Sequence, residues 1–119
     1  GVKKHGRRVS YSAPVRACCD YIDSHLYAPI SLADLARTAN LCQRTISQRF
    51  HAETGLSPVD YIHGERIRAA KYLLQYTPYA ILDISGSLQF SSQSHFTRVF
   101  REHEGVTPMQ YRRQAQAKG

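Results

Sequence analysis

One block of residues occurs twice in this chain of 119 residues. The stretches FHAETGLSPVDYI (residues 50–62) and FREHEGVTPMQYR (residues 100–112) share Phe, Gly, a Ser/Thr-Pro pair and Tyr at the same spacing. Glycine commonly ends a helix, and proline after a capping Ser or Thr commonly begins one. We therefore predict one structural unit that is used twice, with a helix, a break at glycine and a second, capped helix.

Apolar residues recur at three- and four-residue steps along most of the chain, which predicts helices, and no comparable strand pattern is present. The predicted helices cover about residues 13–28, 32–38, 43–53, 58–76, 81–88, 93–103 and 108–114. Their predicted buried residues are Val15, Cys18 or Cys19, Ile22, Leu26, Leu32, Leu35, Ala36, Ile46, Phe50, Val59, Ile62, Ile67, Ala70, Leu73, Leu74, Ile81, Ile84, Leu88, Phe96 and Phe100. The chain is predicted to be all-α.

Short polar residues mark where these helices begin and turn. Ser12 is a predicted N-cap before Pro14, and Ser31 followed by Asp34 resembles a capping box. Asn40 is the residue that we expect at positive φ in the turn before the helix 43–53, because asparagine tolerates that region.

The formal net charge of +7 and the sequence pI near 9.6 favour polyanionic partners, with nucleic acid first and an anionic membrane surface second. No apolar run approaches the roughly 18 residues of a membrane span, and nothing resembles a signal peptide. The three cysteines form neither a disulfide framework nor a zinc-binding spacing, and we expect reduced thiols packed in or near a core. The six histidines lack ligand spacing and no phosphate loop is present, so we predict no metal and no cofactor.

The repeated unit has a short helix, a tight turn and a second helix, on a basic chain. This pattern is typical of helix-turn-helix DNA-binding units. A helix over residues 58–76 would be nearly 30 Å long, at about 1.5 Å per residue. Successive major-groove faces lie roughly 34 Å apart, so we expect this helix to present two reading helices to adjacent groove segments.

The quoted blocks, together with ISLADLA, YIHGERIRAAKYLL and FSSQSHFTRVFREHEGVTPMQYR, resemble the DNA-binding domain of AraC/XylS-type transcriptional regulators. The resemblance covers about residues 14–113, and its second half is the more specific. It implies an all-α fold of seven helices, in two helix-turn-helix subdomains joined by a long central helix. It also implies a bacterial transcription regulator, by family habit an activator, that binds promoter DNA and recruits RNA polymerase in the cytoplasm, at the nucleoid.

We accordingly divide the chain into five parts. These are a basic tail or interdomain linker at 1–12, a first subdomain at 13–56, a linker helix at 57–77, a second subdomain at 78–114 and a C-terminal tail at 115–119. Gly1 in place of methionine and the linker-like start favour a piece of a longer regulator, whose N-terminal domain would bind a ligand or dimerise.

Three positions depart from the family pattern. Asn40 and Gln89 stand in turns where the family usually has glycine. Glutamine at positive φ costs on the order of 1 kcal/mol, so we expect a different geometry for the second turn. Cys42 stands where serine is the usual cap, which should weaken that cap by about 1 kcal/mol.

The predicted contacts with DNA lie on the outward faces of the helices 43–53 and 93–103. Arginine can hold guanine, and glutamine adenine, through two hydrogen bonds in the major groove. With Ile46 and Phe50 buried, the outward residues of the first helix are Arg44, Ser47, Gln48 and His51. Those of the second helix are Gln93, Ser94, Thr97, Arg98 and Arg101, with His95 at the edge.

The resemblance assigns base reading to Arg44, Ser47, Gln48, Gln93, Ser94, His95 and Arg98. Phosphate contacts are predicted for His51, Thr97 and Arg101, and near the helix starts at Ser31, Ser57 and Thr107. The competing interpretation is that these are ordinary solvated side chains. His95 has a further alternative, which is to pack beneath its helix.

Other residues leave alternatives open. Tyr61 and Tyr111 are predicted to pack over the preceding helix, with base stacking as the alternative. Arg66 is a candidate ion-pair partner of an acidic residue such as Asp83. The basic residues Lys3, Lys4, Arg7, Arg8, Arg112 and Arg113 either add non-specific affinity or are simply solvated.

Two other functional classes compete with a DNA-binding regulator. A DNA repair protein with a reactive cysteine would need an activating partner beside Cys18, Cys19 or Cys42, and the sequence shows none. A basic protein–protein adaptor would bind duplex DNA with little dependence on salt. The prediction is therefore a non-enzymatic regulator, whose ligand, promoter and oligomeric state cannot be read from the sequence.

Overall fold

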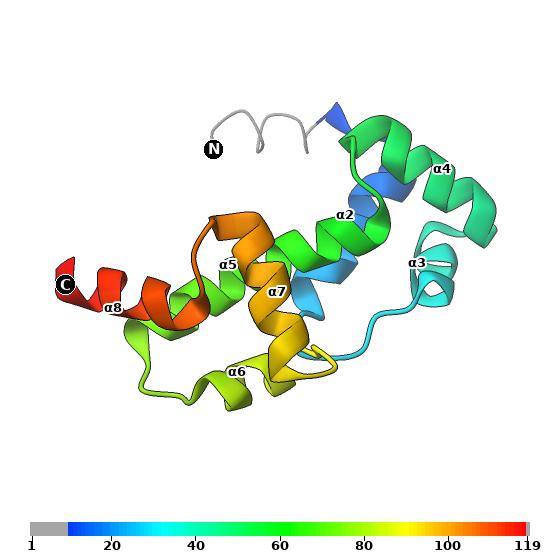
Figure 1. Cartoon of the computed structure of the whole chain (residues 1–119). Helices are drawn as coiled ribbons and strands as arrows, with labels where there is room; N and C mark the ends of the chain where they lie inside the picture. The colour runs from blue at the N-terminus through cyan, green and yellow to red at the C-terminus, as the bar shows by residue number, and fades with distance from the viewer. Residues whose placement is uncertain (1–9, 119) are drawn as a thin grey trace. The chain divides into compact units, whose positions relative to one another are not determined.

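The computed structural model describes residues 10–118, and every regular element with defined bounds in that range is a helix (Figure 1). The seven helices are α2 (Ala13–Ser24), α3 (Leu32–Ala39), α4 (Gln43–Thr54), α5 (Pro58–Tyr76), α6 (Ile81–Ser87), α7 (Gln93–Glu104) and α8 (Pro108–Lys118). Over the described residues, the predicted all-α fold of seven helices is confirmed. The basic residues at positions 3, 4, 7 and 8 lie outside the described residues.

The described residues form two compact units. Residues 10–25 and 29–62 make up the first, and residues 26–28 and 63–118 make up the second. Helix α5 therefore contributes its first turn to the first unit and the rest of its 19 residues to the second.

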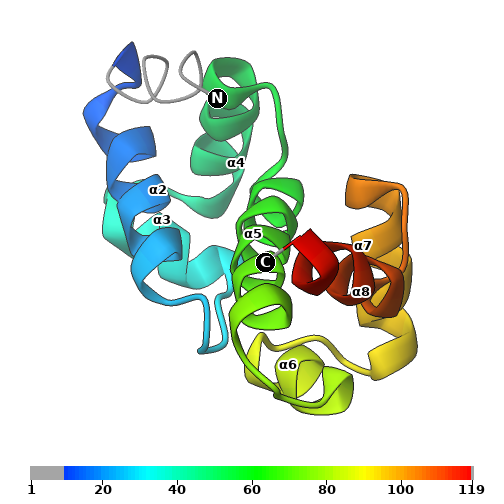
Figure 2. The same cartoon turned by 90° about the vertical axis from the view of Figure 1, so that its left-hand side faces the viewer.

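In the first unit, helices α2, α3 and α4 pack against one another around an apolar core (Figures 1 and 2). Its buried residues are Tyr11, Val15, Cys18, Cys19, Ile22, Leu35, Ala36, Ile46, Phe50, Tyr61 and Ile62. The Tyr61 ring meets the Phe50 ring edge-on at 5.3 Å between centroids, so the predicted packing of this tyrosine over the preceding helix is confirmed.

Tyr11 shows that the folded part begins before the predicted end of the linker at residue 12. Its side chain is buried, and its carbonyl accepts a hydrogen bond from the Arg16 guanidinium at 3.2 Å. The sequence shows no apolar periodicity there because a single aromatic anchor produces none.

The core of the second unit is built by α5, α6 and α7. Its buried residues are Ile67, Ala70, Leu74, Ile81, Ile84, Leu88, Phe90, Phe96, Val99 and Phe100, with Tyr111 packed against them. The Phe100 and Tyr111 rings meet edge-on at 5.7 Å, which confirms the packing prediction for the second tyrosine. Phe90 and Val99 were not among the predicted core residues.

The two helix–helix turns have the same backbone geometry. Asn40 and Gln89 both lie in the left-handed region, at φ of 56° and 67°. The amides of Leu41 and Phe90 donate to the carbonyls five residues earlier, both at 3.0 Å, which closes a Schellman turn in each unit. The expectation that Gln89 alters the second turn is therefore wrong.

A hydrogen bond accompanies the left-handed conformation of Gln89. Its side-chain amide donates to the Tyr27 carbonyl at 3.0 Å, within the second unit. This contact joins residues 62 positions apart and offsets part of the cost of positive φ at a residue with a Cβ.

Four other sequence predictions need correction. Leu32 and Val59 are exposed, Val59 to 59%, because each lies in the first turn of its helix on the side away from the core. Helix α2 ends at Ser24 rather than near Pro29, and α8 continues beyond Gln114 to Lys118.

Ser12 is the N-cap of α2, but its side chain makes no cap hydrogen bond. Its backbone N–H and its hydroxyl instead donate to the two carboxylate oxygens of Glu53, both at 2.7 Å. The start of α2 is thus fastened to the last turn of α4.

The prediction that Arg66 pairs with an acid such as Asp83 is also wrong. Arg66 is buried, and it donates to the carbonyls of Leu26 at 3.1 Å and Ala28 at 2.8 Å. Burial lowers the pKa of this guanidinium. Arg112 acts similarly on the end of α5, donating to the carbonyls of Leu74 at 3.0 Å and Thr77 at 3.2 Å.

Candidate nucleic-acid interface

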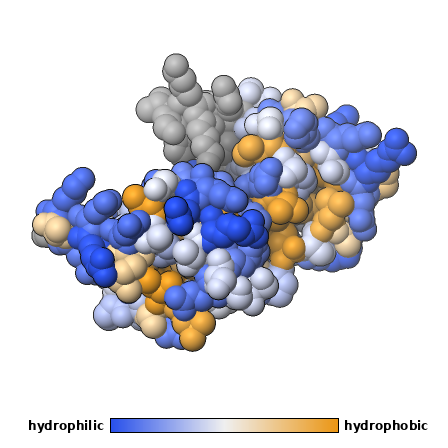
Figure 3. Space-filling view, viewed as in Figure 1, coloured by the Kyte–Doolittle hydropathy of each residue, from blue (hydrophilic) through white to orange (hydrophobic). Residues whose placement is uncertain are grey.

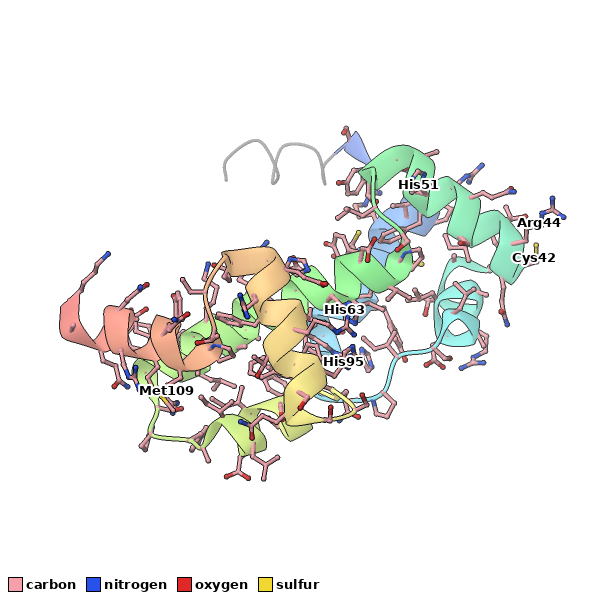
Figure 4. All side chains as sticks on the ribbon, viewed as in Figure 1. Cys42, Arg44, His51, His63, His95 and Met109 are labelled. Carbon is pink, nitrogen blue, oxygen red and sulfur yellow. The ribbon has the colours of Figure 1, made fainter. Side chains whose placement is uncertain are left out.

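Helix α4 has one buried and one exposed face. Ile46 and Phe50 are fully buried, whereas Arg44, Gln48 and His51 are exposed, and Arg44 projects from the start of the helix (Figure 4). Ser47, which lies between these exposed side chains in the sequence, is half-buried. Three of the four residues predicted to face outward are thus exposed, and the fourth, Ser47, is only partly accessible.

The start of α4 lacks the cap that the other helix-turn-helix unit has. Cys42 is the N-cap residue and makes no side-chain cap hydrogen bond. Its exposed thiol lies 3.0 Å from the Thr45 hydroxyl, which lowers the pKa of Cys42. The first turn of α4 contains no acidic residue, so its positive helix end is not neutralised locally.

The outer face of α7 lines a shallow depression in the surface of the second unit. The depression is lined by Gln93, Ser94, Thr97, Arg98, Arg101 and Glu102. Phe96, Val99 and Phe100 are buried on the opposite side of the helix. In Figure 3 the surface over α7, near the middle of the view, is mainly hydrophilic.

Sequence reasoning overlooked the cap of α7. The Ser92 hydroxyl accepts a hydrogen bond from the His95 backbone N–H at 3.0 Å. The signal was a serine directly before the first residue of a predicted helix. This cap defines the first residue of α7, and with it the start of the exposed face of the helix.

His95 packs at the edge of the α7 face, within an aromatic cluster. Its ring lies 5.5 Å from the Phe90 ring and 5.8 Å from the His63 ring between centroids (Figure 4). Its Nδ1 is 3.1 Å from the Ser91 hydroxyl. These contacts favour the packing alternative, although the side chain stays half-exposed.

Acidic side chains modify the charge of α7. Arg98 and Glu102 form an ion pair with 3.7 Å between Nη1 and Oε2, and Glu104 pairs with Lys71 at 3.1 Å. Helix α4 differs, because its only acidic residue is Glu53, which Ser12 engages.

The three predicted phosphate sites at helix starts differ in what already occupies them. Ser31 and Asp34 form a complete capping box, in which the Ser31 backbone N–H lowers the pKa of the Asp34 carboxyl. The Ser57 hydroxyl caps α5 at the Asp60 amide, so this helix start also carries a carboxylate in its first turn.

Helix α8 is the exception among these three. Thr107 exchanges hydrogen bonds with Gln110 at 2.9 and 3.1 Å, and the first turn contains no acidic residue. Because its first turn carries no carboxylate, the start of α8 at Thr107 would repel a phosphate less than the starts of α3 and α5.

Burial of Cys18 works against its reactivity as a nucleophile. Cys18 and Cys19 are buried, and burial raises the pKa of Cys18 to about 11. A nucleophilic thiol needs the opposite shift. The expectation of thiols packed in a core holds for these two cysteines, whereas Cys42 is exposed.

Residues 10–118 contain neither a candidate metal site nor a helix suited to span a membrane. This range contains no cluster of three or more His, Cys, Asp or Glu side chains that is suited to a metal ion. None of its helices combines the length and apolar character that crossing a bilayer requires.

Comparison with known proteins identifies the type of domain. Residues 35–114 match the family described as "Helix-turn-helix domain". The chain is 33% identical over 102 residues to YbfP of Bacillus subtilis, an uncharacterized HTH-type transcriptional regulator. The match covers 86% of this chain and 35% of YbfP, so the chain spans about a third of that relative.

Two solved structures have the same fold. The DNA-binding domain of AdpA, a global transcriptional factor in complex with a target DNA, has a TM-score of 0.83 and 27% identity, and the match covers 90% of this chain and 96% of that one. An AraC-type regulator from Chromobacterium violaceum has a TM-score of 0.82 and 27% identity, with coverage of 89% and 95%. The chain belongs to the AraC-type helix-turn-helix family, and it is the DNA-binding domain of a transcription regulator.

Proposed function

We propose that the chain recognises a specific promoter sequence by inserting both α4 and α7 into the major groove of one duplex. The observation that carries this proposal is the equivalence of the two helices. Each buries a phenylalanine that an edge-on tyrosine contacts, and each exposes arginine and glutamine on the opposite face. Two exposed polar faces of this kind, on a chain of net charge +7, suit two contacts with DNA.

The exposed side chains divide into base readers and phosphate contacts by their chemistry. Arg44 and Arg98 can each grip guanine O6 and N7, and Gln48 can grip adenine N6 and N7. Ser47, Gln93 and Ser94 supply shorter hydrogen-bonding groups beside them. His95 reads a base only from the edge of the α7 face, because its ring is packed on Phe90.

Arg101, Thr97 and His51 are the proposed phosphate contacts on the reading helices. The helix starts at Ser31, Ser57 and Thr107 add backbone N–H groups, and Thr107 is the strongest of these candidates. Phosphate contacts position a protein on DNA without reading its sequence.

The proposal extends to the complete regulator. We infer that further chain, equivalent to the part of YbfP that this domain does not match, carries a ligand-binding or dimerisation domain. The regulator would act in the cytoplasm as an activator that recruits RNA polymerase to the promoter, as predicted from the sequence.

Binding of short duplexes at several salt concentrations tests the division of roles. Arg98→Ala should weaken binding to the preferred site by about 1–3 kcal/mol and relax the preference at one base pair. Arg101→Ala should weaken binding to all duplexes alike and reduce the salt slope by about one.

Unchanged affinity and preference in Arg98→Ala would show that α7 is in a different register from the one proposed. Duplex binding with little salt dependence in the unmodified domain would instead favour the adaptor alternative.

A further inference from the structure

Glu102 is the only acidic residue among those that line the depression on the outer face of α7. Its side chain is 61% exposed, and that of its neighbour Arg98 is 64% exposed. A carboxylate on a face that approaches DNA is repelled by the phosphates of every sequence. Its presence beside the proposed base reader therefore requires an explanation.

We propose that Glu102 is a specificity-determining residue, which holds Arg98 for base reading and penalises binding to non-cognate DNA. This inference rests on the proposed function, and specifically on the role of Arg98. Glu102 acts through Arg98 and through charge, so it is a positioning residue rather than a base reader.

The geometry of the pair leaves Arg98 free to read a base. The closest approach is 3.7 Å, which is longer than a hydrogen bond, so all five guanidinium N–H donors stay available. A guanine needs only two of these donors, in one fork. Arg98 can thus contact guanine with two donors while the carboxylate of Glu102, one helical turn later, still attracts the rest of the guanidinium group.

The same pair opposes non-specific binding. On a non-cognate sequence Arg98 has no guanine fork to fill, and its remaining use is a phosphate contact. Turning toward a phosphate would draw Arg98 away from Glu102 and leave the carboxylate facing the DNA backbone. The cost applies mainly to non-cognate complexes, so it enlarges the ratio of specific to non-specific affinity.

The chain offers a matched control at Glu104. Glu104→Gln removes the same charge from the same helix, but Glu104 pairs with Lys71 and not with a proposed base reader. Comparison of Glu102→Gln with Glu104→Gln therefore separates an effect on Arg98 from an effect of net charge.

The experiment measures affinity for the preferred duplex and for a scrambled duplex of equal length, at one near-physiological salt concentration. The proteins are the unmodified domain, Glu102→Gln, Glu104→Gln, Arg98→Ala and the Arg98→Ala/Glu102→Gln double variant. We expect Glu102→Gln to lower the ratio of the two affinities by about two- to fivefold, the range of exposed ion pairs, mainly through tighter scrambled binding. Glu104→Gln should change both affinities equally, and Glu102→Gln should not alter the ratio once Arg98 is alanine.

Two results would overturn the inference while leaving the proposed function intact. One is a normal ratio in Glu102→Gln together with a lowered ratio in Arg98→Ala. The other is an equal fall of the ratio in Glu102→Gln and Glu104→Gln. If Arg98→Ala itself leaves the ratio unchanged, the proposed role of Arg98 fails, and the inference fails with it.

Discussion

The Phe50–Tyr61 pair of the first unit and the Phe100–Tyr111 pair of the second have ring centroids 5.3 and 5.7 Å apart, both edge-on. Their helix–helix turns also agree, since Asn40 and Gln89 share the left-handed conformation and the same pair of turn hydrogen bonds. The backbone of the turn is thus the same in both units, although the left-handed residue is Asn40 in one and Gln89 in the other.

The side chains that secure α4 and α7 are different. Helix α4 begins at Cys42 without a side-chain cap bond, and its end is held by the two hydrogen bonds from Ser12 to Glu53. Helix α7 begins at a Ser92 cap, and Glu104 near its end is held by Lys71.

The left-handed turn and the edge-on aromatic pair are present twice, whereas caps and polar fastenings vary. We infer that the turn and the aromatic pair set the position of the second helix of each unit, α4 or α7, and that caps and ion pairs adjust its stability.

Removal of the shared phenylalanine should have the largest effect. Phe50→Ala and Phe100→Ala each delete a fully buried ring and should cost about 3–5 kcal/mol of unfolding free energy. Hydrogen exchange should show lost amide protection chiefly in the unit that carries the substitution. Equal loss of protection in both units, for both variants, would contradict the division into two units.

Weakening of the contact between Ser12 and Glu53, which holds the end of α4, should have the second-largest effect on stability. Glu53→Gln weakens two short hydrogen bonds from Ser12 to a half-buried carboxylate, and we expect a loss of about 1–2 kcal/mol in urea unfolding. Glu102→Gln, at an exposed ion pair, is the control and should cost less than about 0.5 kcal/mol. Similar losses in the two variants would show that the Ser12–Glu53 contact is not the fastening that we describe.

Adding a cap to α4 and removing the cap of α7 should change the unfolding free energy in opposite directions. Cys42→Ser supplies α4 with the hydroxyl that α7 already has, and should raise the unfolding free energy by about 1 kcal/mol. Ser92→Ala removes the bond to the His95 amide and should lower it by about the same amount. If Cys42→Ser brings no gain, the missing cap does not distinguish the two helices energetically.

Substitution of the turn residue Gln89 should have the smallest net effect on stability. Gln89→Gly relieves the left-handed strain but loses the hydrogen bond to Tyr27, so we expect a net gain of about 0.5 kcal/mol. Gln89→Ala keeps the strain and loses the same hydrogen bond, and it should therefore destabilise the domain. Thermal unfolding of the two variants distinguishes them, and a loss of stability in Gln89→Gly would mean that the hydrogen bond outweighs the strain.

Sequence reasoning succeeded where local pattern determines structure. The repeat predicted that Tyr61 and Tyr111 pack over the preceding helices, and the predicted burial of Ile46 and Phe50 assigned the outward face of α4. It failed where a contact joins residues that lie far apart in the sequence. The partners of Arg66 are backbone carbonyls of residues 26 and 28, which no spacing of acidic residues could reveal.

The first turns of helices were a second source of error. Leu32 and Val59 fit an apolar periodicity, yet both are exposed, because a helix start lies at the margin of the core. Tyr11 shows the reverse case, since a buried anchor in a basic segment has no periodic neighbours. The DNA contacts of the outward residues remain predictions.

Selection from a random duplex library at near-physiological salt, made in parallel with the unmodified domain, Arg44→Ala and Arg98→Ala, tests the central claim that both units read bases. We predict two conserved patches without palindromic symmetry for the unmodified domain, with Arg44→Ala losing preference in one patch and Arg98→Ala in the other. A single patch, or loss of the same patch in both variants, would contradict the claim.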